Sequence, residues 1–135
     1  MKILAIDFGE KRLGLAVGNS DTRTASPIDP LKRTSPAHDL SRLAGITAEY
    51  EIKKILLGLP LNMDGSEGEI TKKVKGFAKI LKKNLLLPLD FIDERLSSFE
   101  AEQELAPLGL DRKKKKGKID SVAAWILLKE YLEIR

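Results

Sequence analysis

Residues 3–17 read ILAIDFGEKRLGLAV and contain two short apolar runs with a polar connection between them. Ile3–Ile6 and Leu13–Val17 each have the length and composition of a buried strand, and Gly9 lies in the connection. Two such runs joined by a short segment that contains glycine are typical of a β-hairpin. Asp7 directly follows the first run, so the hairpin should carry a carboxylate to the edge of a hydrophobic core.

The rest of the chain alternates between strand and helix patterns. Pro27 and Pro30 cannot donate ladder hydrogen bonds, so the strand that contains them should lie at an edge of the sheet. The expected elements are an edge strand at Ala25–Leu31, a helix from Ser35 to Tyr50, a strand at Ile55–Gly58, a helix capped by Ser66-x-x-Glu69, a strand at Leu89–Ile92, a helix capped by Ser97-x-x-Glu100 and ending near Gly109, and a final helix from about Ile119. This order predicts an α/β fold with a five-stranded mixed sheet and helices on both faces.

Length and composition exclude several kinds of protein. The chain has 135 residues and neither an internal repeat nor a linker, so we expect one domain over residues 1–135. Cysteine is absent and His38 is the only histidine, which excludes thiol chemistry, disulfides and Cys-ligated zinc. We expect His38 to be an exposed residue in the first turn of its helix. No apolar run approaches the ~18 residues of a membrane span, so we expect a soluble, cytoplasmic protein.

Three acidic motifs each follow an isoleucine. They are Asp7, the pair Asp93-Glu94 and Asp120. Hard divalent cations such as Mg²⁺ and Mn²⁺ prefer oxygen ligands, and in-line displacement at a phosphodiester commonly uses two ions about 3.5–4 Å apart. Carboxylates held by rigid elements at the edge of a core therefore indicate metal-dependent nuclease chemistry. Spacing alone does not choose between Asp93 and Glu94.

Each of these acids also has a purely structural explanation. Asp7 and Gly9 suit the backbone geometry of an ordinary turn. Asp120 precedes an apolar helix, where aspartate is a common N-cap. Ala123 and Ala124 favour the functional interpretation, because small side chains let that helix lie close to the sheet and bring Asp120 towards Asp7.

Positive charge is concentrated immediately before Asp120. The net charge is +4, and residues 112–118 alone contribute +6, so the remainder of the chain carries −2. A compact cationic segment beside an acidic motif indicates a polyanionic partner, and we expect a mobile basic loop that binds phosphates. The expected phosphate-binding residues are Arg12, Arg95, Arg112, Lys113, Lys114, Lys115, Lys116 and Lys118. The alternative is a solvated loop that only aids solubility.

Taken together, these motifs resemble the YqgF/RuvX family of the RNase H-like superfamily, whose members are described as Holliday-junction resolvases or pre-16S rRNA nucleases. The resemblance covers essentially the whole chain. It rests on the motifs Asp7-x-Gly9-x-x-Arg12-x-Gly14-x-Ala16, Gly58-Leu59-Pro60, Asp64-Gly65-Ser66, Asp93-Glu94-Arg95-Leu96-Ser97-Ser98 and Asp120-x-x-Ala123-Ala124. It implies an RNase H-like fold, a catalytic and metal-binding triad of Asp7, Glu94 and Asp120, and a site for two Mg²⁺ or Mn²⁺ ions. RuvC-type resolvases usually carry a fourth metal-binding residue where this chain has Ala123.

The resemblance and the residues together predict an endonuclease that acts on structured RNA, most simply in pre-16S rRNA 5′-end processing during ribosome biogenesis. A Holliday-junction resolvase acting on branched DNA as a homodimer is the main alternative, and a monomer is equally compatible with the RNase interpretation. A non-catalytic RNA-binding module would need the basic segment but not three acids. Sugar kinases also place Asp-x-Gly after a first strand, but their fold needs two such domains, and 135 residues cannot supply both.

Overall fold

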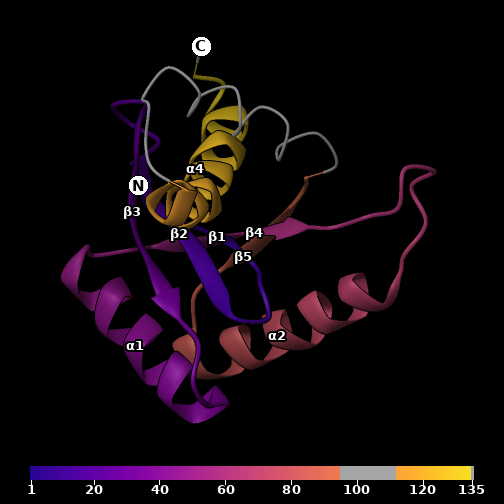
Figure 1. Cartoon of the computed structure of the whole chain (residues 1–135). Helices are drawn as coiled ribbons and strands as arrows, with labels where there is room; N and C mark the ends of the chain where they lie inside the picture. The colour runs from indigo at the N-terminus through magenta and orange to yellow at the C-terminus, as the bar shows by residue number, and fades with distance from the viewer. Residues whose placement is uncertain (95–111, 135) are drawn as a thin grey trace.

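The computed structural model describes the backbone of residues 1–94 and 112–134, and the side chains of residues 1–94 and 121–134. Eight elements are defined in this part of the chain (Figure 1). They are β1 (Lys2–Asp7), β2 (Arg12–Asn19), β3 (Thr24–Lys32), α1 (Pro36–Glu49), β4 (Lys54–Leu59), α2 (Glu69–Leu85), β5 (Leu89–Asp93) and α4 (Arg112–Leu132). The helix expected at Ser97–Gly109 lies outside the described residues, as does Arg95.

The five strands form one mixed sheet in the order β3-β2-β1-β4-β5. β1 and β2 pair antiparallel as the predicted hairpin, and β3 adds antiparallel to β2 at the edge, as its prolines require. β4 pairs parallel with β1, and β5 pairs parallel with β4. The parallel half therefore brings the carboxyl ends of β1, β4 and β5 to one edge of the sheet, which is where Asp7, Gly58 and Glu94 lie.

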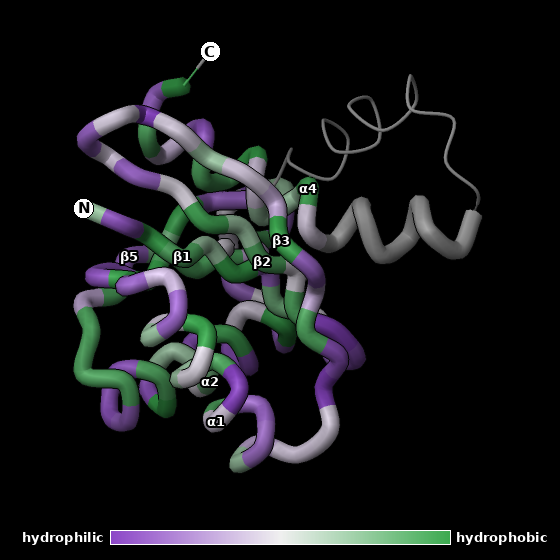
Figure 2. Tube along the Cα trace, turned by 90° about the vertical axis from the view of Figure 1, so that its left-hand side faces the viewer, coloured by the Kyte–Doolittle hydropathy of each residue, from purple (hydrophilic) through white to green (hydrophobic). Residues whose placement is uncertain are grey.

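Successive side chains along the central strands pack on opposite faces of the sheet. On β1, Leu4 and Ile6 join the core under α1 and α2, whereas Ile3 and Ala5 join the core under α4. Figure 2 shows α1 and α2 together on one side of the sheet and α4 on the other. This period of two places apolar side chains of the central strands in both cores, and the helices on both faces confirm what the order of the elements predicted.

Helix α4 is fixed to the sheet by hydrogen bonds from three of its side chains. The Ser121 hydroxyl donates to the Ile28 carbonyl at 2.6 Å, and the Trp125 indole nitrogen donates to the Ala25 carbonyl at 3.0 Å. Near the end of the helix, the Tyr131 hydroxyl donates to Asp90 at 2.6 Å and accepts from Lys54 at 2.8 Å. These contacts reach β3 at one end and β4 and β5 at the other, so α4 crosses the sheet.

Two sequence-based expectations about helix starts were wrong. Ser66 does not cap α2, because its hydroxyl donates to Asp64 within the preceding turn at 2.6 Å and the helix begins at Glu69. There the backbone N–H of Gly68 donates to the Thr71 hydroxyl at 3.1 Å. The second error concerns residues 112–118, which are the first two turns of α4 and not a loop. Lysine and arginine are good helix formers, and their helix propensity prevails over a single internal glycine.

None of the helices in the described part of the chain combines the length and the apolar composition needed to cross a lipid bilayer. His38 is exposed in the first turn of α1, as expected, and its Nδ1 lies 2.7 Å from the Thr34 hydroxyl.

Candidate active site

Asp7 is the last residue of β1 and lies on the face of the sheet that α4 covers. Its position follows from the alternation along β1, in which Ile3 and Ala5 already point to that face. The antiparallel register sets Asp7 opposite Gly14, and the parallel register sets Ile6 opposite Leu57 on β4. Asp7 therefore stands level with Gly58, the next residue of β4.

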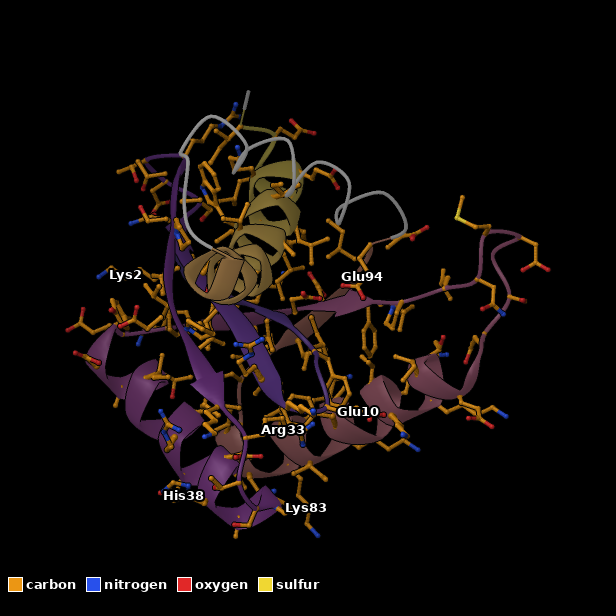
Figure 3. The ribbon with its side chains drawn as sticks, viewed as in Figure 1. Lys2, Glu10, Arg33, His38, Lys83 and Glu94 are labelled. Atoms are coloured by element: carbon orange, nitrogen blue, oxygen red, sulfur yellow. The ribbon has the colours of Figure 1, made fainter. Side chains whose placement is uncertain are left out.

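Glu94 reaches the same place from the end of β5 (Figure 3). The backbone N–H of Glu94 donates to the carbonyl of Leu59 at 3.3 Å, which ties the residue to the end of β4. Its side chain lies over Gly58, and a Cβ at position 58 would collide with Glu94 Oε2 and come within 2.8 Å of the Leu127 side chain. The absence of a side chain at Gly58 therefore gives the Glu94 carboxylate the space to reach Asp7.

The two carboxyl groups are in direct contact. Burial raises the pKa of Glu94 to about 9, and the neighbouring charge of Asp7, a hydrogen bond with Asp7 and the charge of Asp93 act in the same direction. Glu94 Oε2 has essentially no exposed surface. Two acids that share one partly buried place repel each other when both are ionised, and a cation between them removes that repulsion. Asp93 acts on the pKa of Glu94 through its charge, and its own side chain is exposed.

The other residues expected at the site are placed less completely. Arg12 is the first residue of β2, just beyond the Asp7–Gly9 turn, and its side chain is half-buried. The backbone of Asp120 belongs to α4, one residue before the buried Ser121, but its side chain and those of residues 112–118 are outside the described set. Among the described side chains, no three acidic or histidine groups converge on one point.

Arg33 holds the backbone of the β1–β2 turn, which directly follows Asp7. Arg33 donates to the Gly9 carbonyl at 3.1 Å and to Asp39 at 3.2 Å, and its guanidinium lies 4.9 Å from the centroid of the Phe8 ring. Asp39 is buried and also accepts from the Thr34 backbone N–H at 3.0 Å. A rigid support of this kind keeps the adjoining carboxylate in a fixed position.

Sequence reasoning missed the roles of Gly58, Arg33 and Asp39. The sequence contains no local signal for Gly58, because a glycine in a strand can mark a bulge, a bend or a close approach. Asp39 could have been noticed as an acid on the buried side of α1, four residues before the core residue Leu43. Its partner Arg33 could not, because the contact depends on how the chain enters α1.

Solved structures share this fold. The structure of Thermus thermophilus RuvC in complex with a Holliday junction substrate superposes with a TM-score of 0.62 at 15% identity, over 99% of this chain and 97% of that one. The Fowlpox virus resolvase bound to Holliday junction DNA gives a TM-score of 0.60 at 16% identity, over 98% and 97%. The protein has a RuvC-like fold of the RNase H-like class.

The chain belongs to the RuvX family. The family model described as "RuvX: Holliday junction resolvase" matches residues 1–134. A protein of Anaeromyxobacter sp. (strain K) is 42% identical over 135 residues, which are 100% of this chain and 98% of that protein. A protein of Halothermothrix orenii is 41% identical over 132 residues, covering 98% and 94%. Both relatives carry the name "Putative pre-16S rRNA nuclease".

Proposed function

We propose that this protein is a metal-dependent endonuclease that trims the 5′ end of pre-16S ribosomal RNA. The observation that carries the proposal is the contact between Asp7 and Glu94 at the carboxyl edge of the sheet, with Gly58 making room for it. A pair of partly buried acids in contact is costly for stability, and such costs are concentrated at functional sites. The full-length relatives named for pre-16S rRNA support the substrate.

The residues at this edge fit Mg²⁺ or Mn²⁺. The donors are carboxylate oxygens, which hard divalent ions prefer, and the charge of Asp7 against Glu94 is the repulsion that a bound cation relieves. Asp7 and Glu94 would hold the metal, and Asp120 would complete the set. Magnesium needs few protein ligands, because it keeps several waters and takes substrate oxygens as well. When bound, the ions supply charge stabilisation and an activated water for phosphodiester hydrolysis.

Asp120 is included because of its place on α4. It precedes Ala124 and Leu127 by four and seven residues; Ala124 packs in the core that contains Ile3 and Ala5 of β1, and Leu127 is buried against Gly58 of β4. Residues with these spacings share one stripe of a helix, so the backbone at position 120 lies on the stripe that faces the sheet. Leu127 approaches the Cβ position of Gly58, which places this stripe above the Asp7 and Glu94 edge.

The protein itself contributes orientation and phosphate binding. The hydrogen bond from Arg33 to the Gly9 carbonyl fixes the turn after Asp7, and the hydrogen bond from the Glu94 N–H to Leu59 fixes the approach of Glu94. Arg12 and the lysines of residues 112–118 would bind phosphates of the substrate. Because those lysines belong to the first turns of α4, they would present charge from the same helix that carries Asp120.

Holliday-junction resolution is a second candidate, and the description of the matching family model favours it. Cutting a symmetric junction needs two active sites and therefore a homodimer, whereas trimming one RNA end needs only one. Ala123 occupies the position where resolvases of the RuvC type usually carry a fourth metal-binding residue, which favours the RNA substrate.

A side-by-side cleavage assay tests the proposal. The full chain is incubated with Mg²⁺ and either a pre-16S rRNA fragment with its 5′ extension or a four-way DNA junction, with Glu94→Gln as the inactive control. We expect cleavage of the RNA extension by the wild type, little cleavage of the junction and none of either by the variant. Preferential cleavage of the junction would establish the second candidate, and equal cleavage by the variant would refute the site.

A further inference from the structure

A recess lies on the opposite face of the sheet from α4, between α1, α2 and the β1–β2 turn. Its volume is about 470 Å³. The residues that form its walls include Phe8, Arg33, Lys73, Gly76, Phe77 and Ile80. None of these residues belongs to the acidic site, although Phe8 directly follows Asp7 in the chain.

The walls of this recess are aromatic and rigid. The Phe8 and Phe77 rings lie 5.3 Å apart between centroids and are tilted by 57°. The Arg33 guanidinium lies 4.9 Å from the first ring and 5.5 Å from the second, and its hydrogen bonds to Asp39 and Gly9 keep it there. Ile80 leaves 45% of its surface exposed. Flat apolar faces next to a planar cation are complementary to an aromatic ring of a ligand.

The charges within the recess are balanced, which disfavours a phosphate as its occupant. Arg33 pairs with Asp39, and Lys73 pairs with Glu10 at 2.7 Å. The Lys73 hydrogen bond and charge hold the pKa of Glu10 below its ordinary value, so Glu10 is ionised at neutral pH. Figure 3 shows Glu10 and Arg33 close to each other at the β1–β2 turn. An uncharged ring therefore suits this recess better than an anion.

Unbalanced positive charge lies beside the recess, on α2. This helix contains six lysines and one glutamate. Lys72, Lys79 and Lys83 are exposed, and with Gly76 they recur at the four- and three-residue spacings that share one stripe of a helix. Figure 3 shows Lys83 extending away from the ribbon. We call these three residues the lysine stripe; it borders the recess at Gly76.

The recess and the acidic site share the end of β1. Consecutive Cα atoms are about 3.8 Å apart, so Phe8 begins the wall of the recess within one residue of Asp7. Asp7 faces the α4 side, whereas Phe8 packs on the α1 and α2 side. A nucleic-acid strand with a phosphate at Asp7 could thus pass over the β1–β2 turn and continue along α2.

We propose that the recess binds one unpaired base of a single-stranded segment of the substrate, while the lysine stripe binds the adjoining phosphates. The inference rests on the proposed function, because it assumes a nucleic-acid substrate at Asp7. Stacking of bases on aromatic side chains beside a positively charged track is the general mode of single-strand binding. This mode does not read the sequence, so any base fits.

Two helical glycines allow a sharp test. A Cβ at Gly76 meets no atom within 4 Å, and the same holds for Gly45 on the exposed surface of α1. Gly76→Leu fills the recess, Gly76→Ala makes the same gain in helix propensity but leaves the recess open, and Gly45→Leu places the same side chain elsewhere. All three should fold at least as stably as the wild type, because glycine is a poor helix former. Thermal unfolding checks this.

Binding is measured by fluorescence anisotropy in EDTA with a short single-stranded RNA, in which each base in turn is replaced by an abasic ribose. The RNA is only long enough to occupy the recess and the lysine stripe in one register, so for the wild type we expect one position at which base removal weakens binding on the order of tenfold. Gly76→Leu should bind the intact RNA about tenfold more weakly and lose nothing further at that abasic position. Gly76→Ala and Gly45→Leu should bind like the wild type.

Three outcomes would overturn the inference: no abasic position that weakens wild-type binding, intact binding by Gly76→Leu, or an abasic penalty that persists in Gly76→Leu. The first outcome is measured on the wild type alone, so it does not depend on whether a variant folds. Because the assay contains no metal, it does not depend on cleavage. If the wild type cleaves RNA but no abasic position weakens its binding, this inference alone is refuted. If one abasic position weakens binding but the wild type cleaves no RNA, the proposed function alone is refuted.

Discussion

Asp39 and Glu94 are both shielded from solvent, yet their surroundings differ in every respect. Asp39 faces a cation and a backbone N–H, so its charge is compensated on both oxygens. Glu94 faces Asp7 and lies near Asp93, so its charge is opposed. The first environment stabilises the ionised carboxylate, whereas in the second a proton or a bound cation has to offset the repulsion between the two carboxyl groups. The comparison separates an acid that stabilises the fold from one that we propose to act in the active site.

The largest expected effect is the loss of cleavage activity when Asp7 or Glu94 is changed. Asp7→Asn and Glu94→Gln each keep the size of the side chain but remove the charge that would bind metal. We expect cleavage of pre-16S rRNA to fall by about 10²- to 10³-fold, the scale seen when one preorganised charge-stabilising group is removed. Initial rates under saturating substrate and Mg²⁺ measure this. Activity within a few-fold of the wild type in either variant would contradict the assignment.

Changing Asp39 should lower the stability of the fold and leave the chemistry of cleavage unaffected. Asp39→Ala leaves Arg33 without its carboxylate partner and Thr34 without its acceptor, and we expect the free energy of unfolding to fall by about 3 kcal/mol. Urea denaturation measures the change. Asp29→Ala removes an exposed acid on β3 and serves as the control, with a change within about 0.5 kcal/mol. Equal effects of the two variants would show that Asp39 does not brace the turn.

Glu94 should make the free energy of unfolding depend on pH in the absence of metal. Because the pKa of Glu94 is raised from 4.5 to about 9 in the folded protein, its contribution is fully present below pH 4.5 and is lost as pH rises towards 9. Between pH 5 and pH 8, we expect the wild type to lose about 4 kcal/mol more than Glu94→Gln does. Urea unfolding in EDTA at both pH values measures this difference. Parallel pH profiles would show that Glu94 ionises normally.

Asp90 is a third acid to compare with Asp39 and Glu94. It is more exposed than they are, so we expect the loss of its hydrogen bond to have the smallest effect on stability. A hydrogen bond from Lys54 and another from Tyr131 lower the pKa of Asp90, and its side chain is 45% exposed. Tyr131→Phe removes the hydroxyl that joins Asp90 to Lys54, and we expect a loss of about 1 kcal/mol in unfolding free energy with unchanged cleavage. A loss of activity in this variant would mean that the far end of α4 affects the site.

Much of the fold could be predicted because it depends on short-range patterns. The hairpin around Gly9, the edge position of the proline-bearing strand and the helix from Ser35 follow from local chemistry, and the structure confirms each of them. The start of α2 could not be predicted in the same way. Two features competed for Ser66, and the turn with Asp64 prevailed over the helix cap.

The site was less predictable because it depends on register and on partners distant in sequence. Asp93 and Glu94 are adjacent, and a shift of one residue exchanges the faces to which they point. Only the pairing of Leu59 with Asp93 and the open space at Gly58 bring Glu94 inward. The three-acid site, which includes Asp120, stays a prediction, as do phosphate binding by Arg12, Arg95 and residues 112–118 and the resident metal.

The central claim is that Asp7 and Glu94 form a metal site, and calorimetric titration with Mn²⁺ tests it most directly. The wild type, Glu94→Gln and the control Asp29→Asn are titrated at the same pH without nucleic acid. The account predicts saturable binding by the wild type and by Asp29→Asn, and binding at least about tenfold weaker in Glu94→Gln. Binding by Glu94→Gln that equals the wild type would contradict the account, as would the absence of binding in all three proteins.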